Sequence, residues 1–357
     1  MNHEQYLGLR RFPALDGLRA VAAAMVVFFH FGGPSWERLY GWIGVHIFFV
    51  LSGFLITTLA LREESRNGRL SIKNFWKRRI ARILPAYYVV LAVVAGVALA
   101  RGEYAGGLGE VMLRYLTLNG EFVGPDAPQS QLWTIGIEQK FYLVWPVLGF
   151  AAVLTAARRA AAGIVLLAAL LGLAATMPVL VSYIPITLGC LVAVLLHDPR
   201  GFRAVSWLTR PLGATIVALV FVAGHLALPI GSRVLGPGGP VIIAYAVLVA
   251  VLVVSLVGRG PVGWVLARRP LTFVGDRSYS LYLVQALAGL VVAATIPALG
   301  VHRTVTAVVV LAVALLMADL MYRWVEQPAI ALGRRWVAAP QRRTEESRPA
   351  VAAPIAA

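Results

Sequence analysis

The chain has 357 residues, of which 59% are hydrophobic and only 13% are charged, against roughly 25% charged residues in soluble domains. The mean hydropathy is +0.78. This composition excludes a soluble protein, because so few charges cannot cover a water-facing surface, and it excludes a disordered chain. Cys190 is the only cysteine, which excludes a disulfide scaffold. The sequence therefore predicts an all-α integral membrane protein that crosses the bilayer many times.

Ten segments are long and apolar enough to cross a bilayer, which takes about 20 residues per helix. They are residues 14–33, 40–61, 84–100, 132–154, 162–178, 180–196, 211–229, 239–258, 278–297 and 305–325. We therefore expect about ten transmembrane helices in a membrane domain of residues 14–330. A short N-terminus (1–13) precedes this domain, and a tail (331–357) that we expect to be disordered follows it.

Membrane topology explains the net charge of +16. Of the 32 Lys and Arg residues, 24 fall in the two termini and in alternate loops, five fall in the other loops, and three lie within spans. The positive-inside rule then predicts that both termini are cytoplasmic. We expect a multi-pass protein of the bacterial plasma membrane that binds no nucleic acid. The first span carries charges and lacks a small-residue cleavage site, so it is expected to remain as an anchor.

Ionisable residues inside a span are costly, so each is a candidate functional residue. The first span carries Asp16, Arg19 and His30. Asp16 and Arg19 are one helical turn apart and can form an ion pair. Arg19 and His30 share a helix face, because a separation of 11 residues at about 100° each leaves their directions around the helix axis within roughly 20° of each other. Along the axis they are about 16 Å apart. Structural alternatives are an ion pair without catalytic function and a histidine that only bonds a neighbouring helix.

The fourth span contributes a carboxylate close to the expected depth of His30. Glu138 lies about six residues below the outer end of this span. A histidine and a carboxylate at one depth can form a general-base pair, in which the carboxylate orients the ring and raises its basicity. The alternative is an interfacial ion pair between Glu138 and Lys140. We expect no metal ion, and we expect Cys190 to be an inert core residue.

The loop after the second span is more basic than topology requires. The segment FWKRRIARILP (75–85) carries four cations in six positions. Arg79 and Arg82 are three residues apart and would share a helix face. Because arginine binds phosphate oxygens bidentately, a cytosolic polyphosphate such as a coenzyme A ester is a candidate ligand. The positive-inside signal and binding of anionic lipid are alternatives that explain the same residues.

Several segments together resemble the membrane acyltransferase family 3. They are RFPALDGLRAVAAAMVVFFH, GVHIFFVLSGFLIT, FWKRRIARILPAYY, LWTIGIEQKFYLVWP, SYSLYLVQ and VEQPAI. The first contains Arg19 and His30 at the family's Arg-x10-His spacing. The resemblance extends over residues 11–330, nearly the whole chain. It implies transfer of an acyl group, typically acetyl from acetyl-CoA, to a hydroxyl of a sugar, cell-envelope glycan, lipid or macrolide-type metabolite.

The resemblance also implies roles for individual residues. His30 is the expected catalytic base, which either deprotonates the acceptor hydroxyl or first takes the acyl group itself. The other catalytic candidates are Glu138, Arg19 and Asp16. The candidates for binding acetyl-CoA, or another acyl-CoA, are Arg78, Arg79 and Arg82. The candidates for substrate binding are His46, Ser52, Tyr142, Tyr279, Tyr282 and Gln285.

Three positions depart from the family pattern. His46 replaces the usual aspartate after Gly-Val, Gln139 replaces a frequent second glutamate, and Gln285 replaces a frequent histidine. The last change removes a role for a second histidine, and His46 would instead supply a ring near the outer mouth. The family often carries a fused extracytoplasmic esterase-like domain. We expect a stand-alone form here, which works alone or passes its acyl group to a separate extracytoplasmic partner.

Two other functions fit the same features. A transporter or exporter without acyl-transfer chemistry would account for ten spans, intramembrane charges and a basic cytoplasmic mouth. The family pattern and the lack of an internal repeat in the sequence oppose it. A structural membrane protein of an envelope complex is the third possibility.

Overall fold

The computed structural model describes residues 1–338 except 237, 259 and 302. The regular elements of these described residues are helices, and they include no strand, which confirms the all-α prediction. The long helices are α2 (Pro13–Phe31), α4 (Gly44–Asn67), α5 (Ile72–Ala100), α7 (Trp133–Phe150), α8 (Ala156–Leu173), α9 (Tyr183–His197), α11 (Pro211–Leu226), α13 (Gly239–Leu256), α16 (Ser278–Thr295), α17 (Arg303–Met321) and α18 (Gln327–Ala338). The short helices include α1 (His3–Gly8), α3 (Pro34–Glu37), α6 (Gly109–Leu116), α10 (Pro199–Val205), α12 (Leu228–Leu235), α14 (Pro261–Leu266) and α15 (Arg269–Asp276).

Eight helical segments of the described residues are long and apolar enough to cross a membrane, or nine if the bent pair α10–α11 is one span. The two parts of that pair meet at 76°. The predicted fourth span is the 18-residue helix α7, which does not meet the same criterion because Glu138, Gln139 and Lys140 lower its hydropathy. The protein is thus a multi-pass membrane protein whose described residues form eight or nine apolar spans, and α7 packs among them against α4, α5, α8 and α9.

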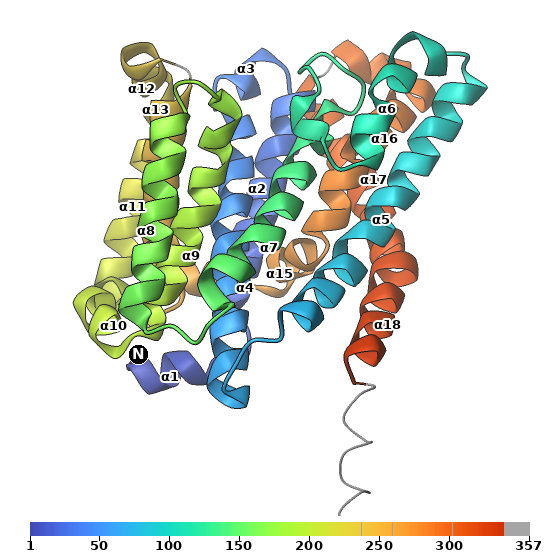
Figure 1. The fold of residues 1–357 in the computed structure, drawn as a ribbon. Coiled ribbons are helices and arrows are strands. Elements are labelled where there is room, and N and C mark those ends of the chain that lie inside the picture. Colours follow the sequence, from blue (N-terminus) through green and yellow to red (C-terminus); the bar gives the residue numbers. More distant parts are fainter. Residues whose placement is uncertain (237, 259, 302, 339–357) are drawn as a thin grey trace, which may run out of the picture.

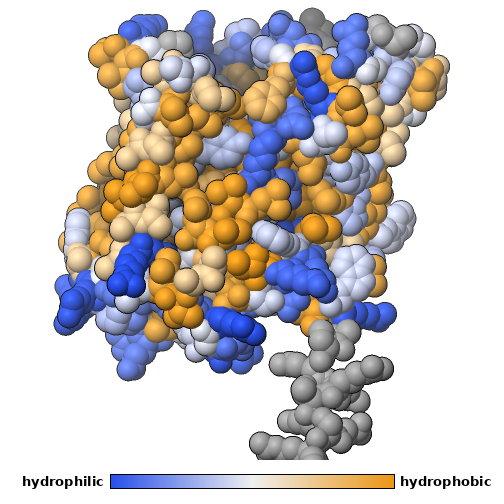
Figure 2. All heavy atoms as spheres, viewed as in Figure 1, coloured by the Kyte–Doolittle hydropathy of each residue, from blue (hydrophilic) through white to orange (hydrophobic). Residues whose placement is uncertain are grey.

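The helices lie side by side with their long axes in roughly one direction (Figure 1). The N-terminus, α1, α10 and α18 lie at one end, which we call the terminal end, and α3, α6 and α12 lie at the opposite end (Figure 1). Figure 2 shows an apolar band around the middle of the visible face, with hydrophilic residues gathered at both ends. This distribution matches a bilayer core with water on either side.

The predicted tail differs from the structure in its first part. Residues 331–338 belong to α18, which continues α17 through a π-helical turn at Tyr322–Glu326. The helix is anchored where Gly333 approaches Ala81 of α5. Residues 339–357 lie outside the described residues.

Helix α4 is the central helix. In its most apolar stretch of 18 residues, 83% is buried inside the protein. One of its faces contributes Val45, Phe49 and Ile56 to a core shared with α5, α7 and α16. Another face contributes Ile47 and Leu51 to a second core, shared with α9 and α13. Because α4 packs on both sides, its position determines the walls of any cavity along it.

Candidate functional site

A cavity of about 390 Å³ lies between α2, α4, α5, α7, α15, α16 and α18. The α4 residues that line the cavity recur at intervals of about three or four positions, as expected for one face of a helix. These residues are Val45, Phe48, Phe49, Ser52, Leu55, Ile56, Thr58, Leu59 and Arg62. Arg62 follows Val45 by 17 positions, so this face is roughly 26 Å long at a rise of 1.5 Å per residue. The cavity therefore runs through most of a bilayer core of about 30 Å.

The cavity reaches the terminal end, where Arg10, Arg11 and Arg334 line it. Arg11 is 55% exposed. Its guanidinium donates to Asp16 at 2.8 Å and also pairs with Asp276 of α15. These two ion pairs hold α2 and α15 together at the mouth. Asp16 therefore pairs with Arg11, and the predicted pair between Asp16 and Arg19 is not formed in the structure.

A second group of arginines, which we call the inner group, lines the half of the cavity near the terminal end: Arg19, Arg62, Arg79 and Arg82. The Nε atoms of Arg19, Arg62 and Arg79 are buried without a hydrogen-bond partner among the described residues. Arg79 lies over the rings of Phe75 and Tyr142, at 5.5 and 5.8 Å from their centroids. Arg62 belongs to this group although the sequence indicated only a topology signal there, because it stands at the end of a span.

The neighbouring arginine of the basic loop has a different environment. Arg78 is absent from the cavity lining, and its Nη2 donates to Glu63 at 2.5 Å. Ser71 caps the start of α5 by accepting a hydrogen bond from the backbone of Asn74. Arg79 and Arg82 are about one helical turn apart in α5, so both side chains lie on the cavity face. Arg78 lies on a different face of the helix and points away from the cavity.

Two carboxylates lie among the inner arginines. Glu138 interacts with the hydroxyls of Ser52 and Tyr142 and with the charges of Arg19 and Arg79. Ser52 and Tyr142 also form a hydrogen bond with each other. Glu326, which the sequence analysis placed only within a family segment, accepts a hydrogen bond from Ser280 at 3.0 Å and is 2% exposed.

Positive charge exceeds negative charge in the cavity. Among the described lining residues there are seven arginines and four carboxylates. Glu138 and Glu326 are the two carboxylates near the four arginines of the inner group. Asp16 also interacts with the charge of Arg19. Since charges within a membrane protein are costly unless they are paired, the inner part is suited to an anion with at least two negative charges.

His30 lies outside this cavity. It occupies the last turn of α2 toward the opposite end, where it is exposed, and it is absent from the lining. No hydrogen bond joins it to Glu138 in the described part of the chain, so the predicted pair is not formed. Glu138 is level with Ser52, well below the start of α4, and thus deeper than expected. Lys140 bonds Glu121 and the carbonyl oxygen of Leu118, so the alternative Glu138–Lys140 pair is not formed either.

The other predicted substrate-binding residues divide into two sets. Those that line the cavity are Ser52, Tyr142, Tyr279 and Tyr282. His46 and Gln285 are buried outside it, at 1% and 2% exposure. The ring of His46 is packed between Trp42 and Phe49, with Nδ1 3.3 Å from the carbonyl oxygen of Ile43. No three His, Cys, Asp or Glu side chains of the described residues are placed to hold a metal ion.

The fold and the cavity define a multi-pass helical membrane protein with a basic cavity between its helices. Residues 12–323 match the family model described as an acyltransferase domain, and the chain belongs to this acyltransferase family. The resemblance seen in the sequence is thereby confirmed.

Relatives with O-acetyltransferase names cover most of the chain. It is 27% identical to the peptidoglycan O-acetyltransferase OatA of Listeria monocytogenes over 88% of its length, and 30% identical to the putative peptidoglycan O-acetyltransferase YrhL of Bacillus subtilis over 91%. A putative O-acetyltransferase of Staphylococcus aureus is 34% identical over 43% of the chain and covers 27% of its own length. The chain spans 55% and 56% of the first two relatives. No solved structure matches it.

Proposed function

We propose that the chain is an O-acetyltransferase of the bacterial plasma membrane that binds acetyl-CoA, or another acyl-CoA, in the cavity. The observation that carries this proposal is the excess of arginines in its inner part, with buried Nε atoms that lack partners among the described residues. Coenzyme A carries phosphate groups that these arginines can bind. Its long, thin pantetheine arm can occupy the remainder of the cavity. The positive-inside rule makes the terminal end cytoplasmic, where acyl-CoA is available.

The reaction that we propose uses both ends of the protein. Arg19, Arg79 and Arg82 hold the phosphates, and the arm runs along α4 with the thioester foremost. An acceptor hydroxyl approaches from the opposite end, where His30 removes its proton while the oxygen attacks the thioester carbonyl. The C–S bond breaks, and the proton taken up by His30 neutralises the coenzyme A thiolate. The names of the relatives favour a cell-envelope glycan as the acceptor.

Binding of radiolabelled acetyl-CoA to the detergent-purified protein tests the donor site. Replacing Arg79 by Ala should remove a charged hydrogen bond worth about 1.5–3 kcal/mol, which weakens binding by roughly 10- to 150-fold. Arg78→Ala is the matched control, because Arg78 precedes it in the same helix and pairs with Glu63 outside the cavity. Equal affinities of the two variants would contradict the proposed donor site.

Transfer to a glycan acceptor tests the role of His30. We expect His30→Ala to bind acetyl-CoA like the wild type and to lose acetyl transfer, because the base acts only in the chemical step. Full transfer by this variant at wild-type expression would refute the assignment. Movement of a substrate across the membrane without release of free coenzyme A would instead support the transporter.

A further inference from the structure

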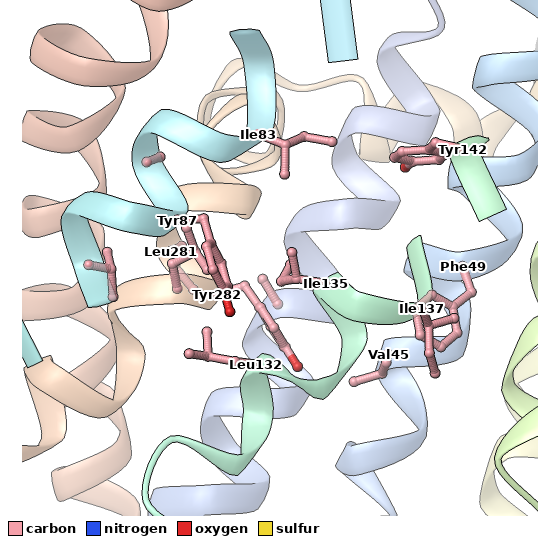
Figure 3. Close-up of a cluster of buried hydrophobic side chains, with 14 of the residues drawn as sticks. Val45, Phe49, Ile83, Tyr87, Leu132, Ile135, Ile137, Tyr142, Leu281 and Tyr282 are labelled. Carbon is pink, nitrogen blue, oxygen red and sulfur yellow. The ribbon is translucent and has the colours of Figure 1, made fainter. Parts of the chain in front are cut away.

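The two halves of the cavity have different chemistry. The half near the terminal end contains the arginines, whereas Val45, Phe48, Phe49 and Ile135 line the far half. In Figure 3, Tyr142 lies at one level of the cluster, and Val45 and Phe49 lie further along α4. An acyl-CoA held by its phosphates would therefore place its acyl group in apolar surroundings.

Aromatic rings line and narrow the far half of the cavity. Phe49 is 1% exposed and packs edge-to-face on Trp133 and His46, with ring centroids 5.7 and 5.9 Å apart. Phe48 lies 6.4 Å from the ring of Tyr282. The hydroxyl of Tyr282 donates to the backbone carbonyl of Gln131 at 2.7 Å, which fixes this ring. Packed rings of this kind do not yield to an added group without strain.

We propose that Phe48 and Phe49 set the length of the acyl group that the cavity accepts and restrict it to short acyl groups. This inference rests on the proposed function, because it takes an acyl-CoA as the occupant. Phe48 and Phe49 stand one turn beyond Ser52 on the α4 face, so the arm reaches them after it passes the arginines. Each further methylene of a longer acyl chain would press against the two rings or withdraw the phosphates from the arginines.

A competition experiment with the purified full-length protein tests the proposal. Bound radiolabelled coenzyme A is displaced by acetyl-, butyryl- and octanoyl-CoA, for the wild type and for Phe48→Ala, Phe49→Ala and Phe48→Leu. We expect the wild type to bind octanoyl-CoA at least about tenfold more weakly than acetyl-CoA, because an apolar pocket of limited size discriminates added methylenes. Phe48→Ala and Phe49→Ala should reduce this ratio to near one, because both variants remove a ring against which the longer chain would press.

Phe221→Ala is the matched control, because Phe221 is half-buried against Tyr245 and outside the cavity lining. It should keep the wild-type ratio. Phe48→Leu, a milder change at a half-buried position, gives a folded variant with an intermediate ratio if the alanine variants do not fold. If coenzyme A binds but the ratio stays at the wild-type value in the Phe48 variants, the acyl-length proposal is refuted and the proposed function stands. If neither the wild type nor any variant binds coenzyme A, the proposed function itself is refuted.

Discussion

Gly53→Ala is expected to destabilise the protein, because Gly53 lies where α4 and α9 cross at close range. A Cβ atom at Gly53 would lie 1.9 Å from the carbonyl oxygen of Ile186, and one at Gly189 would lie 2.0 Å from that of Val50. Ordinary contacts are about 3.5 Å, so the helices would have to separate. Overpacking costs about 1–3 kcal/mol, and a rigid carbonyl places this case near the upper limit. Alanine regains about 1 kcal/mol of helix propensity, which leaves a net loss of about 2 kcal/mol.

Thermal unfolding in detergent at a fixed scan rate, followed by tryptophan fluorescence, measures this loss as an apparent midpoint. A net loss of about 2 kcal/mol should lower the midpoint by roughly 4 °C. Gly172→Ala in α8 is the matched control, because no atom lies within 4 Å of a Cβ built there. It should leave the midpoint unchanged or raise it. If Gly53→Ala proves as stable as Gly172→Ala, close packing of α4 on α9 does not limit stability, and the reasoning is wrong.

Two further predictions concern charged residues near the terminal end. Glu64→Gln should cost about 3–5 kcal/mol, because the side chain of Arg159 is only 4% exposed and its Nη2 donates to both Glu64 carboxylate oxygens, at 2.8 and 2.9 Å. Asp198 caps α10, and hydrogen bonds from the backbone N–H groups of Gly201 and Arg200 hold the pKa of its carboxyl below the usual range. Asp198→Ala should therefore cost about 1 kcal/mol at neutral pH, and the difference should shrink as pH falls through that lowered pKa.

Both effects are measured as shifts of the thermal midpoint against matched controls. Glu63→Gln breaks a partly exposed pair with Arg78 and should cost less than about 1 kcal/mol. Similar losses in the Glu63 and Glu64 variants would contradict the importance of burial. Asp198→Asn keeps a capping oxygen and should retain most of the stability. A loss in Asp198→Ala that stays constant from neutral to acidic pH would show that the charge of the cap contributes nothing.

The sequence predicted the positions of helices well because a chain in a bilayer must satisfy its own backbone hydrogen bonds, and long apolar segments show where it does so. It predicted less well which helices are apolar enough to span. Helix α7 is one of the ten predicted spans, but Glu138 faces the cavity and Lys140, which does not line it, bonds Glu121. Hydropathy along one segment cannot reveal that neighbouring helices supply partners for such residues.

Depth within the bundle was predicted less accurately than position along the chain. The spacing of Arg19 and His30 along one helix follows from helix geometry, but the depth of Glu138 relative to α2 depends on how α7 sits against α4. A small error in the assumed start of a span moves a side chain by several ångströms. The expected His30–Glu138 pair failed for this reason, and Glu138 lies with Arg19 and Arg79 instead.

The sequence by itself determined the class of protein, the helical segments and a set of candidate polar residues, because composition and periodicity depend only on the order of residues along the chain. Only the tertiary structure decided which of these residues meet. It placed Arg62 and Glu326 in the cavity with Arg79 and Arg82, and turned Arg78 away from it. These outcomes follow from the close crossings and rotations of packed helices, which depend on contacts between segments far apart in the sequence.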